Sequence, residues 1–131
     1  MISIVITLNS NDLSEFYEKV TALKQKGKKV TLAIGGWNDS QGDKYSRLVN
    51  NPAKRAAFIT HAIEFIEKHN FDGLDLDWEY PKCWQVNCDK GPASDKQAFA
   101  DWVTELKTAF KPRGLLLSAA VSPSKKVIDE G

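Results

Sequence analysis

Four short apolar segments, separated by stretches with helical periodicity, constrain the fold more than any other feature of this 131-residue chain. The segments run from Ile2 to Leu8, Lys29 to Ile34, Phe71 to Asp77 and Leu115 to Val121. Segments that are apolar along most of their length are typical of parallel strands, which are buried on both faces. Strands alternating with helices predict βαβ units, and therefore an α/β fold with a parallel sheet. An open doubly wound sheet and a barrel both satisfy this pattern.

Three helices are expected between the strands. The first is predicted to end at Gly27, since glycine is the preferred residue just beyond a helix. The residues expected to cap the three helices are Asn11 or Asp12, then Asn51 followed by Pro52, and then Ser94 or Asp95. Such side chains accept hydrogen bonds from the free N–H groups of a first helical turn, and proline is favoured at the first helical position. The chain contains no internal repeat or linker, so we interpret residues 1–131 as one structural unit.

Charge and composition exclude several classes of partner. Eighteen Lys and Arg residues against seventeen Asp and Glu residues leave a net charge of +1, which gives no electrostatic reason to expect nucleic acid or an anionic membrane. No apolar run approaches the ~20 residues that span a bilayer. The apolar start lacks a basic segment and a cleavage site, so no signal peptide is predicted. No Gly-x-Gly-x-x-Gly motif follows a strand, and nothing indicates a dinucleotide.

The segment from Phe71 to Pro81 carries acidic residues at alternate positions, namely Asp75, Asp77 and Glu79. Side chains alternate across a strand, so these three carboxylates should share one face, with leucines and a tryptophan on the other. Burying an isolated charge costs several kcal/mol, so such groups pair, bind metal or take up a proton. Neighbouring carboxylates raise the pKa of one of them, which suits acid–base catalysis at the carboxyl end of a strand.

Two other interpretations fit the acidic segment less well. A solvated edge strand would tolerate the charges, but the intervening leucines argue against it. A divalent-metal site of the Asp-x-Asp kind fits the spacing, but no histidine or further acid is supplied nearby, and we predict no metal. Cys83 and Cys88 lie five residues apart and cannot make a four-ligand zinc site on their own. Their spacing leaves a local disulfide and two free thiols as alternatives.

The stretch from Asp72 to Glu79, Asp-Gly-Leu-Asp-Leu-Asp-Trp-Glu, resembles the Asp-Gly-x-Asp-x-Asp-x-Glu signature of the family 18 glycoside hydrolases, the chitinases. The preceding strand motif of that family, Ser-x-Gly-Gly, is similar to the stretch ending in Gly35 and Gly36, with Ala33 in place of the serine. The two cysteines match a pair found after the signature in secreted arthropod-type chitinases. The resemblance covers roughly residues 11–131, and residues 1–10 match poorly.

This resemblance implies part of a (β/α)8 TIM barrel, in which the last three strands of the chain are the third to fifth. It implies hydrolysis of β-1,4-linked N-acetylglucosamine in chitin or chitooligosaccharides by a substrate-assisted, retaining mechanism without cofactor. Glu79 would be the general acid, Asp77 would orient the acetamido group, and Asp75 would share a proton with Asp77. The expected substrate-binding residues are Trp37, Tyr80, Gly35 and Gly36, with core packing as the alternative for the two aromatic residues.

The chain is about half as long as the roughly 250 residues of a complete barrel. We therefore expect a central fragment of a catalytic domain, with exposed barrel edges that promote self-association and with little activity of its own. The resemblance also implies an extracellular protein. A chitin-binding, lectin-like relative without catalysis and an interaction fragment completed by another chain are the alternative interpretations.

Overall fold

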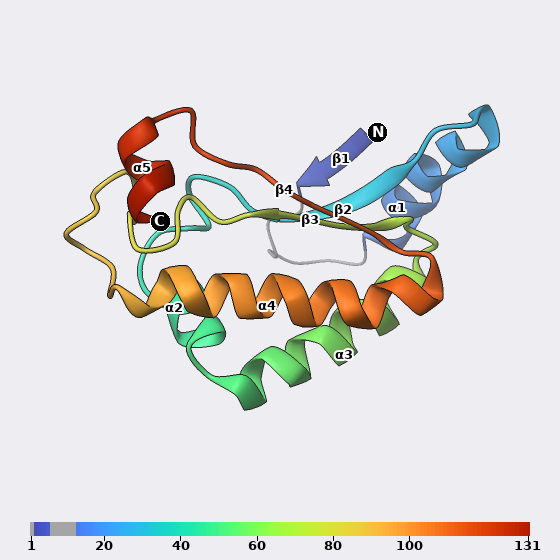
Figure 1. Ribbon diagram of the computed structural model, residues 1–131. Coiled ribbons are helices and arrows are strands. Elements are labelled where there is room, and N and C mark those ends of the chain that lie inside the picture. Colours follow the sequence, from blue (N-terminus) through green and yellow to red (C-terminus); the bar gives the residue numbers. More distant parts are fainter. Residues whose placement is uncertain (1, 6–12) are drawn as a thin grey trace.

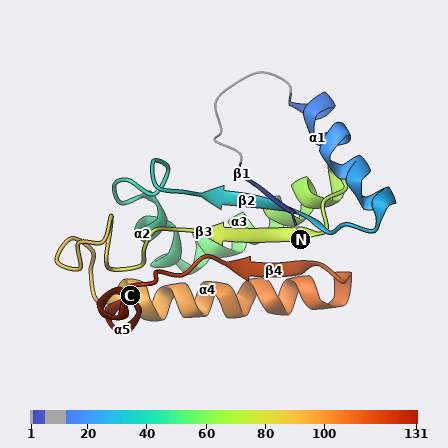
Figure 2. The ribbon, with the colours of Figure 1, turned by 90° about the horizontal axis from the view of Figure 1, so that it is seen from above.

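A four-stranded parallel sheet forms the centre of the chain. In the structure, a computed structural model that describes residues 2–5 and 13–131, the strands lie in the order β1-β2-β3-β4. Their bounds are β1 Ile2–Val5, β2 Val30–Gly35, β3 Gly73–Asp77 and β4 Leu116–Ala119. All three pairings are parallel. The carboxyl ends of the strands therefore meet at one edge of the sheet, where the loops and the last helix also gather (Figure 2).

Two long helices cover one face of the sheet (Figure 1). The helices are α1 Ser14–Thr21, α2 Lys44–Val49, α3 Pro52–Lys68, α4 Ser94–Phe110 and α5 Lys125–Glu130. α3 and α4 lie side by side on the same face, and the strands follow one another in sequence order. A doubly wound sheet reverses its strand order and places helices on both faces, whereas a barrel does neither. The arrangement is therefore a segment of a barrel wall, which resolves the alternative that the sequence left open.

The hydrophobic core lies between the sheet and these helices. From the sheet it takes Leu74 and Leu76, and from α4 it takes Trp102, Leu106 and Phe110, all at most 1% exposed. Burying a side chain of this size contributes about 1.5–3 kcal/mol, so the contact between β3 and α4 is a large part of the folding free energy. Trp102 belongs to this core, as the helical spacing of its apolar neighbours predicts.

Helix starts follow the sequence rules in one case and depart from them in another. Asn51 caps α3 as predicted, because its side chain accepts a hydrogen bond from the Lys54 N–H and Pro52 occupies the first position. The prediction that Ser94 or Asp95 caps α4 is wrong, since both residues lie within the helix and Ala93 precedes it without a side-chain cap. The predicted caps Asn11 and Asp12, and the predicted strand residues from Ile6 to Leu8, lie outside the described residues.

Three elements differ from the predicted pattern. The first helix does not run unbroken to Gly27, because it becomes a 3₁₀ helix over Ala22–Lys26 before Gly27 ends it in a left-handed conformation. α2 lies in a stretch for which no helix was predicted, and α5 follows the last strand without having been predicted. No helix in the described ranges is long and apolar enough to cross a bilayer.

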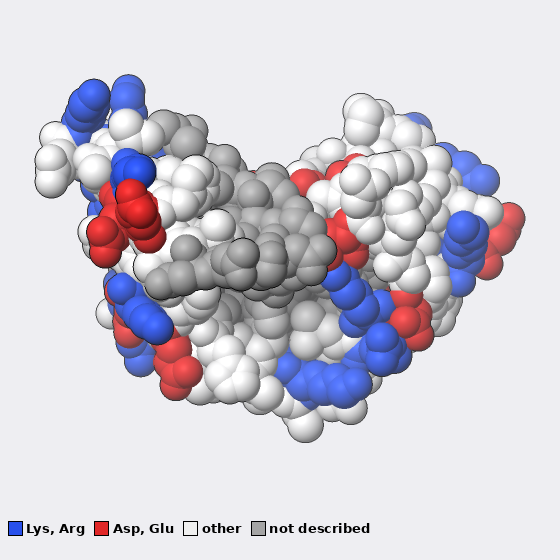
Figure 3. Space-filling view, turned by 180° about the vertical axis from the view of Figure 1, so that it is seen from behind, with Lys and Arg blue, Asp and Glu red and all other residues white. Residues whose placement is uncertain are grey.

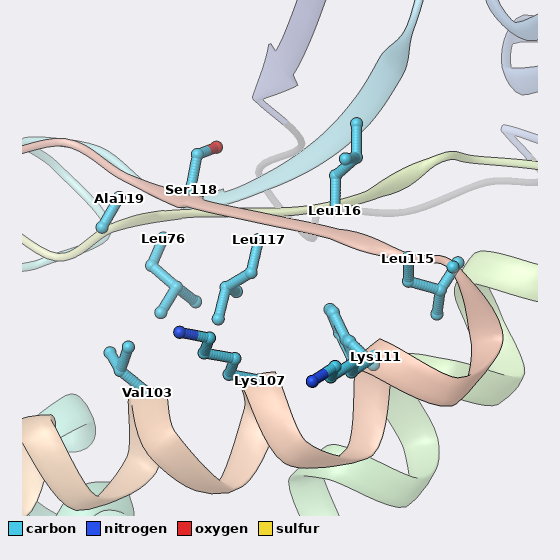
Figure 4. Close-up of a pocket in the computed structure, with 11 residues that line it drawn as sticks. Leu76, Val103, Lys107, Lys111, Leu115, Leu116, Leu117, Ser118 and Ala119 are labelled. Atoms are coloured by element: carbon cyan, nitrogen blue, oxygen red, sulfur yellow. The ribbon is translucent and has the colours of Figure 1, made fainter.

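β4 forms one edge of the sheet within the described ranges. Between β4 and α4 lies a groove of about 640 Å³ that is lined mainly by apolar side chains (Figure 4). Leu117 and Leu76 point from the sheet toward α4, whereas Leu116 and Ser118 point to the opposite face. The exposed barrel edge expected from the sequence is therefore present at this strand.

Candidate active site

The acidic residues of the signature emerge at the carboxyl end of β3. Asp75 pairs in register with Ala33 on β2 and Ser118 on β4, and Asp77 pairs with Gly35. Asp75, Asp77 and Glu79 are each half-buried. The residues between them, Leu74, Leu76 and Trp78, are 0%, 1% and 2% exposed. β3 therefore gives one face to the core and the other to the carboxylates, as the alternating sequence predicts.

Figure 3 shows that the surface on the side away from α3 and α4 is hollowed, with acidic side chains along the hollow beside the lobe that carries α5. Within the site, the Ser118 hydroxyl donates a hydrogen bond of 2.7 Å to Oδ1 of Asp75. The pKa of Asp77 is raised, first by burial and then by the negative charges of Glu79 and Asp75. A carboxyl group that keeps its proton to higher pH beside other carboxylates can serve in acid–base chemistry.

The two glycines before Trp37 bring β2 against the backbone of Asp77. The Gly36 N–H donates to the Asp77 carbonyl at 2.7 Å. Gly35 has a φ of 110°, and a Cβ at this position would lie 2.3 Å from the same carbonyl oxygen. Only glycine fits this contact, because any side chain would push β3 away. The structure thus gives Gly35 and Gly36 a packing role at the end of β3.

Ser40 is a site residue that the sequence analysis missed. Its side chain is 0% exposed, and its hydroxyl accepts a 2.9 Å hydrogen bond from the Glu79 N–H and donates a 3.3 Å bond to the Asp77 carbonyl. The sequence places Ser40 in a polar stretch, Asn-Asp-Ser-Gln-Gly, where a serine is expected to be solvated. No local signal distinguishes it, because its partners lie about forty residues further along the chain.

Tyr45, on α2, is hydrogen-bonded to the turn that contains Asp39 and Ser40. The Tyr45 hydroxyl donates to Oδ2 of Asp39 at 2.6 Å, and the Tyr45 ring stacks on Trp78 with 5.8 Å between centroids. Burial raises the pKa of Tyr45, and the hydrogen-bonded Asp39 raises it further. Burial would also raise the pKa of Asp39, but hydrogen bonds from Lys44 and Tyr45 outweigh burial and leave it lowered. Asp39 is therefore an ionised partner of Tyr45 at neutral pH.

The two predicted aromatic binding residues differ in exposure. Trp37 is 47% exposed at the carboxyl end of β2, and its carbonyl accepts a 2.8 Å hydrogen bond from the Gln85 side chain. Tyr80 is half-buried and packs against the disulfide. Its pKa is raised by burial, then by the charge of Glu79, with which it also shares a side-chain hydrogen bond. Tyr80 therefore packs beneath the loop and also contacts the acidic group, and its role in substrate binding stays a prediction.

The loop between β3 and α4 is held by a disulfide and by a buried carboxylate. Cys83 and Cys88 are bonded, which decides between the two alternatives for this pair. Trp84, between the cysteines, donates from its indole nitrogen to Asp95 at 2.9 Å and packs against the main core. Within the described ranges, the only grouping of three potential metal ligands is the two cysteines with Glu130, and both sulfurs are used by the disulfide.

Comparison with known proteins agrees with this geometry. The family model described as glycosyl hydrolases family 18 matches residues 3–131. The chain is 64% identical over 118 residues to "Probable chitinase 10" of Drosophila melanogaster, covering 90% of this chain and 5% of that protein. It is 41% identical over 106 residues to an endochitinase of Manduca sexta, covering 79% and 18%.

Among solved structures, catalytic domain 2 of the Ostrinia furnacalis Group II chitinase is 64% identical, with a TM-score of 0.90. The match covers 94% of this chain and 33% of that one. A mutant of the same domain was crystallised in complex with the chitooligosaccharide (NAG)5. The chain thus spans a minor part of each of these relatives. The family match over nearly its whole length, together with the barrel segment and the intact acidic signature, shows that the chain is a member of glycosyl hydrolases family 18.

Proposed function

We propose that residues 1–131 form a single piece of a chitinase catalytic domain and carry its proton-transferring strand. The reaction is hydrolysis of β-1,4-N-acetylglucosamine linkages in chitin or chitooligosaccharides. The observation that carries the proposal is the group of three carboxylates formed by Asp75 and Asp77 on β3 and by Glu79 just beyond its end, in which burial and neighbouring charge raise the pKa of Asp77. The relatives named as chitinases, at 64% and 41% identity, support the substrate class.

In this proposal, Glu79 protonates the glycosidic oxygen as the bond from that oxygen to C1 breaks. The acetamido oxygen of the substrate bonds to C1 on the opposite side, which gives an oxazolinium ion. Water then attacks C1, Glu79 takes the proton from that water, and the acetamido group is released with net retention of configuration. Asp77 holds the acetamido N–H during these steps, and Asp75, fixed by Ser118, sets the charge next to Asp77.

The rim of the site supplies the sugar contacts. Trp37 presents a broad exposed face at the end of β2, and sugar rings stack on such faces. Tyr80 lies beside Glu79 and borders the same space. Gly35 and Gly36 support this rim by holding it against β3. No metal ion or organic cofactor takes part in the proposed mechanism.

The remainder of the barrel is supplied by sequence outside the matched segment in the relatives, since the chain covers only 33% of the Ostrinia furnacalis domain. We expect the isolated chain to hydrolyse chitin poorly, because electrostatic positioning from the missing walls is a large part of catalysis. We also expect it to self-associate through the edge of β4, which light scattering on the purified chain will detect. The disulfide fits an oxidising, extracellular compartment.

The test uses a chimera in which this chain replaces the matching segment of the Ostrinia furnacalis domain. Turnover of a chromogenic chitobiose substrate is measured for the chimera, for Glu79→Gln and for the matched control Glu64→Gln, an exposed glutamate on α3. Loss of the general acid is expected to lower kcat by about 100-fold or more, with the control unchanged. A folded chimera that binds chitin without hydrolysing it would favour the lectin-like alternative, and equal activity of all three proteins would contradict the role of Glu79.

A further inference from the structure

We infer that Ser40 is a positioning residue for Glu79, an inference that rests on the proposed role of Glu79 as the general acid. Ser40 is completely buried in the turn that follows Trp37. Its hydroxyl contacts the backbone on both sides of Trp78, accepting from the Glu79 N–H at 2.9 Å and donating to the Asp77 carbonyl at 3.3 Å. One side chain thus joins the two acidic residues through their main chain.

The need for this contact arises from where the two strands part. The register between β2 and β3 ends with Gly35 opposite Asp77, and the Gly36 N–H makes the last backbone bond to the Asp77 carbonyl. The chain of β2 then turns away, and the Ser40 N–H closes that turn by donating to the Gly36 carbonyl at 2.8 Å. The Glu79 N–H therefore lies beyond the ladder, and the Ser40 hydroxyl provides the acceptor that a continued strand would have provided.

The pair of bonds also fixes the direction of the Glu79 side chain. Trp78 is 2% exposed and its ring is held in the core, stacked on Tyr45. Ser40 holds the carbonyl just before Trp78 and the N–H just after it, so rotation of the chain at Trp78 breaks at least one of these bonds. With both bonds in place, the Glu79 carboxylate stays on the face that carries Asp77, whose pKa responds to its charge.

The same turn carries the proposed sugar platform. Trp37 begins it and Ser40 ends it, so the aromatic face and the acid are attached to one short segment. The Gln85 side chain holds the Trp37 carbonyl from the loop after Glu79. Ser40 thereby couples the position of the bound sugar to the position of the proton donor, and small displacements of either are costly to catalysis.

The experiment compares Ser40→Ala with Ser40→Thr, which keeps the hydroxyl, in the chimera described above. Thr21→Ala is the matched control, because Thr21 is also buried and also donates its hydroxyl to a backbone carbonyl, that of Tyr17, at 2.8 Å but on α1. Amide hydrogen exchange at Glu79 is measured in the chimera and in the 131-residue chain, together with kcat, KM and the thermal midpoint of the chimera.

For Ser40→Ala we expect exchange at the Glu79 amide to be about fivefold faster, corresponding to the loss of one hydrogen bond. We expect kcat to fall about tenfold with KM within about twofold, because misplacement affects the transition state more than binding. Ser40→Thr should recover most of both effects. Thr21→Ala should lower the thermal midpoint while leaving kcat and Glu79 exchange unchanged.

Unchanged exchange at Glu79 in Ser40→Ala, or a loss of kcat equal to that of Thr21→Ala, would overturn the inference. A failure of the proposed function has a different signature. In that case the unmodified chimera and Glu79→Gln have the same turnover, whereas hydrogen exchange still reports whether Ser40 holds the Glu79 main chain.

Discussion

Asp95 offers the sharpest test of how the loop after Glu79 is held. It is 0% exposed in the first turn of α4, and the described partners of its carboxylate are all neutral hydrogen-bond donors. The four donors are Ser46 Oγ at 2.6 Å, Asn50 Nδ2 at 2.8 Å, Lys82 N at 3.1 Å and Trp84 Nε1 at 2.9 Å. One carboxylate thereby joins α2, α4 and the disulfide loop.

Replacing Asp95 by asparagine keeps the shape of the side chain and one of its oxygens. That oxygen can still accept from Ser46 and Asn50, but the new NH₂ group faces the donors of Lys82 and Trp84. Leaving buried donors without an acceptor costs about 1–3 kcal/mol each, so we expect a loss of about 3 kcal/mol in the free energy of unfolding. For a chain of this length, 1 kcal/mol corresponds to about 3–4 °C, which places the midpoint about 10 °C lower.

The assay is thermal unfolding of the 131-residue chain followed by circular dichroism. Asp101→Asn is the control, because Asp101 lies on the same helix and makes an exposed hydrogen bond to Gln97; its variant should stay within about 0.5 kcal/mol of the unmodified chain. The refuting result is an Asp95→Asn variant that melts at or above the unmodified midpoint. That outcome would mean that the cost of burying the charge exceeds the value of its four hydrogen bonds.

Two further predictions concern the disulfide and the acidic face. Replacing both Cys83 and Cys88 by serine removes a cross-link between residues five apart, which should cost about 2 kcal/mol, and reductant should lower the unmodified midpoint to that of the variant. A thermal midpoint of the unmodified chain that stays the same when reductant is added would contradict this prediction. Asp77→Asn should stabilise the chain at neutral pH, because a raised folded pKa means that ionising Asp77 weakens the fold as pH rises above its usual value of 3.8. The gain in thermal midpoint should vanish below that pH, and a gain independent of pH would contradict the assignment.

The two faces of β3 could be predicted from the sequence because alternation is a local property of a strand. Leu74 and Leu76 reach the core and Asp75 and Asp77 do not, as the pattern indicates. The start of α3 could be predicted equally well, since Asn51 and Pro52 act on the helical turn that they begin. Where the partners of a residue lie within a few positions, propensity and pattern rules are sufficient.

The burial of Ser40 and Asp95 could not be predicted, for the opposite reason. Each is a short polar residue in a sequence context that favours a solvated turn or a helix cap, and each is fully buried. The hydroxyl of Ser40 contacts backbone atoms of Asp77 and Glu79, and the carboxylate of Asp95 reaches back to α2, across more than forty residues. Local rules assign such residues to water or to the nearest helix end, because nothing near them in the sequence indicates a distant partner.

The positions of Ser40 and Asp95 show how the chain can keep an acidic site that lowers its stability. Carboxylates gathered on one face of a strand weaken the fold, which is the meaning of the raised pKa of Asp77. The opposing face of β3 compensates with fully buried leucines, but packing alone does not fix the backbone beyond the last ladder bond. Ser40 holds the main chain at Glu79, and Asp95 holds the following loop through Lys82 and Trp84. Stabilisation of the strand and positioning of its acid are therefore carried mainly by different residues, so variants of Ser40 should lower activity by more than their loss of stability explains, whereas in variants of Leu76 activity should follow stability.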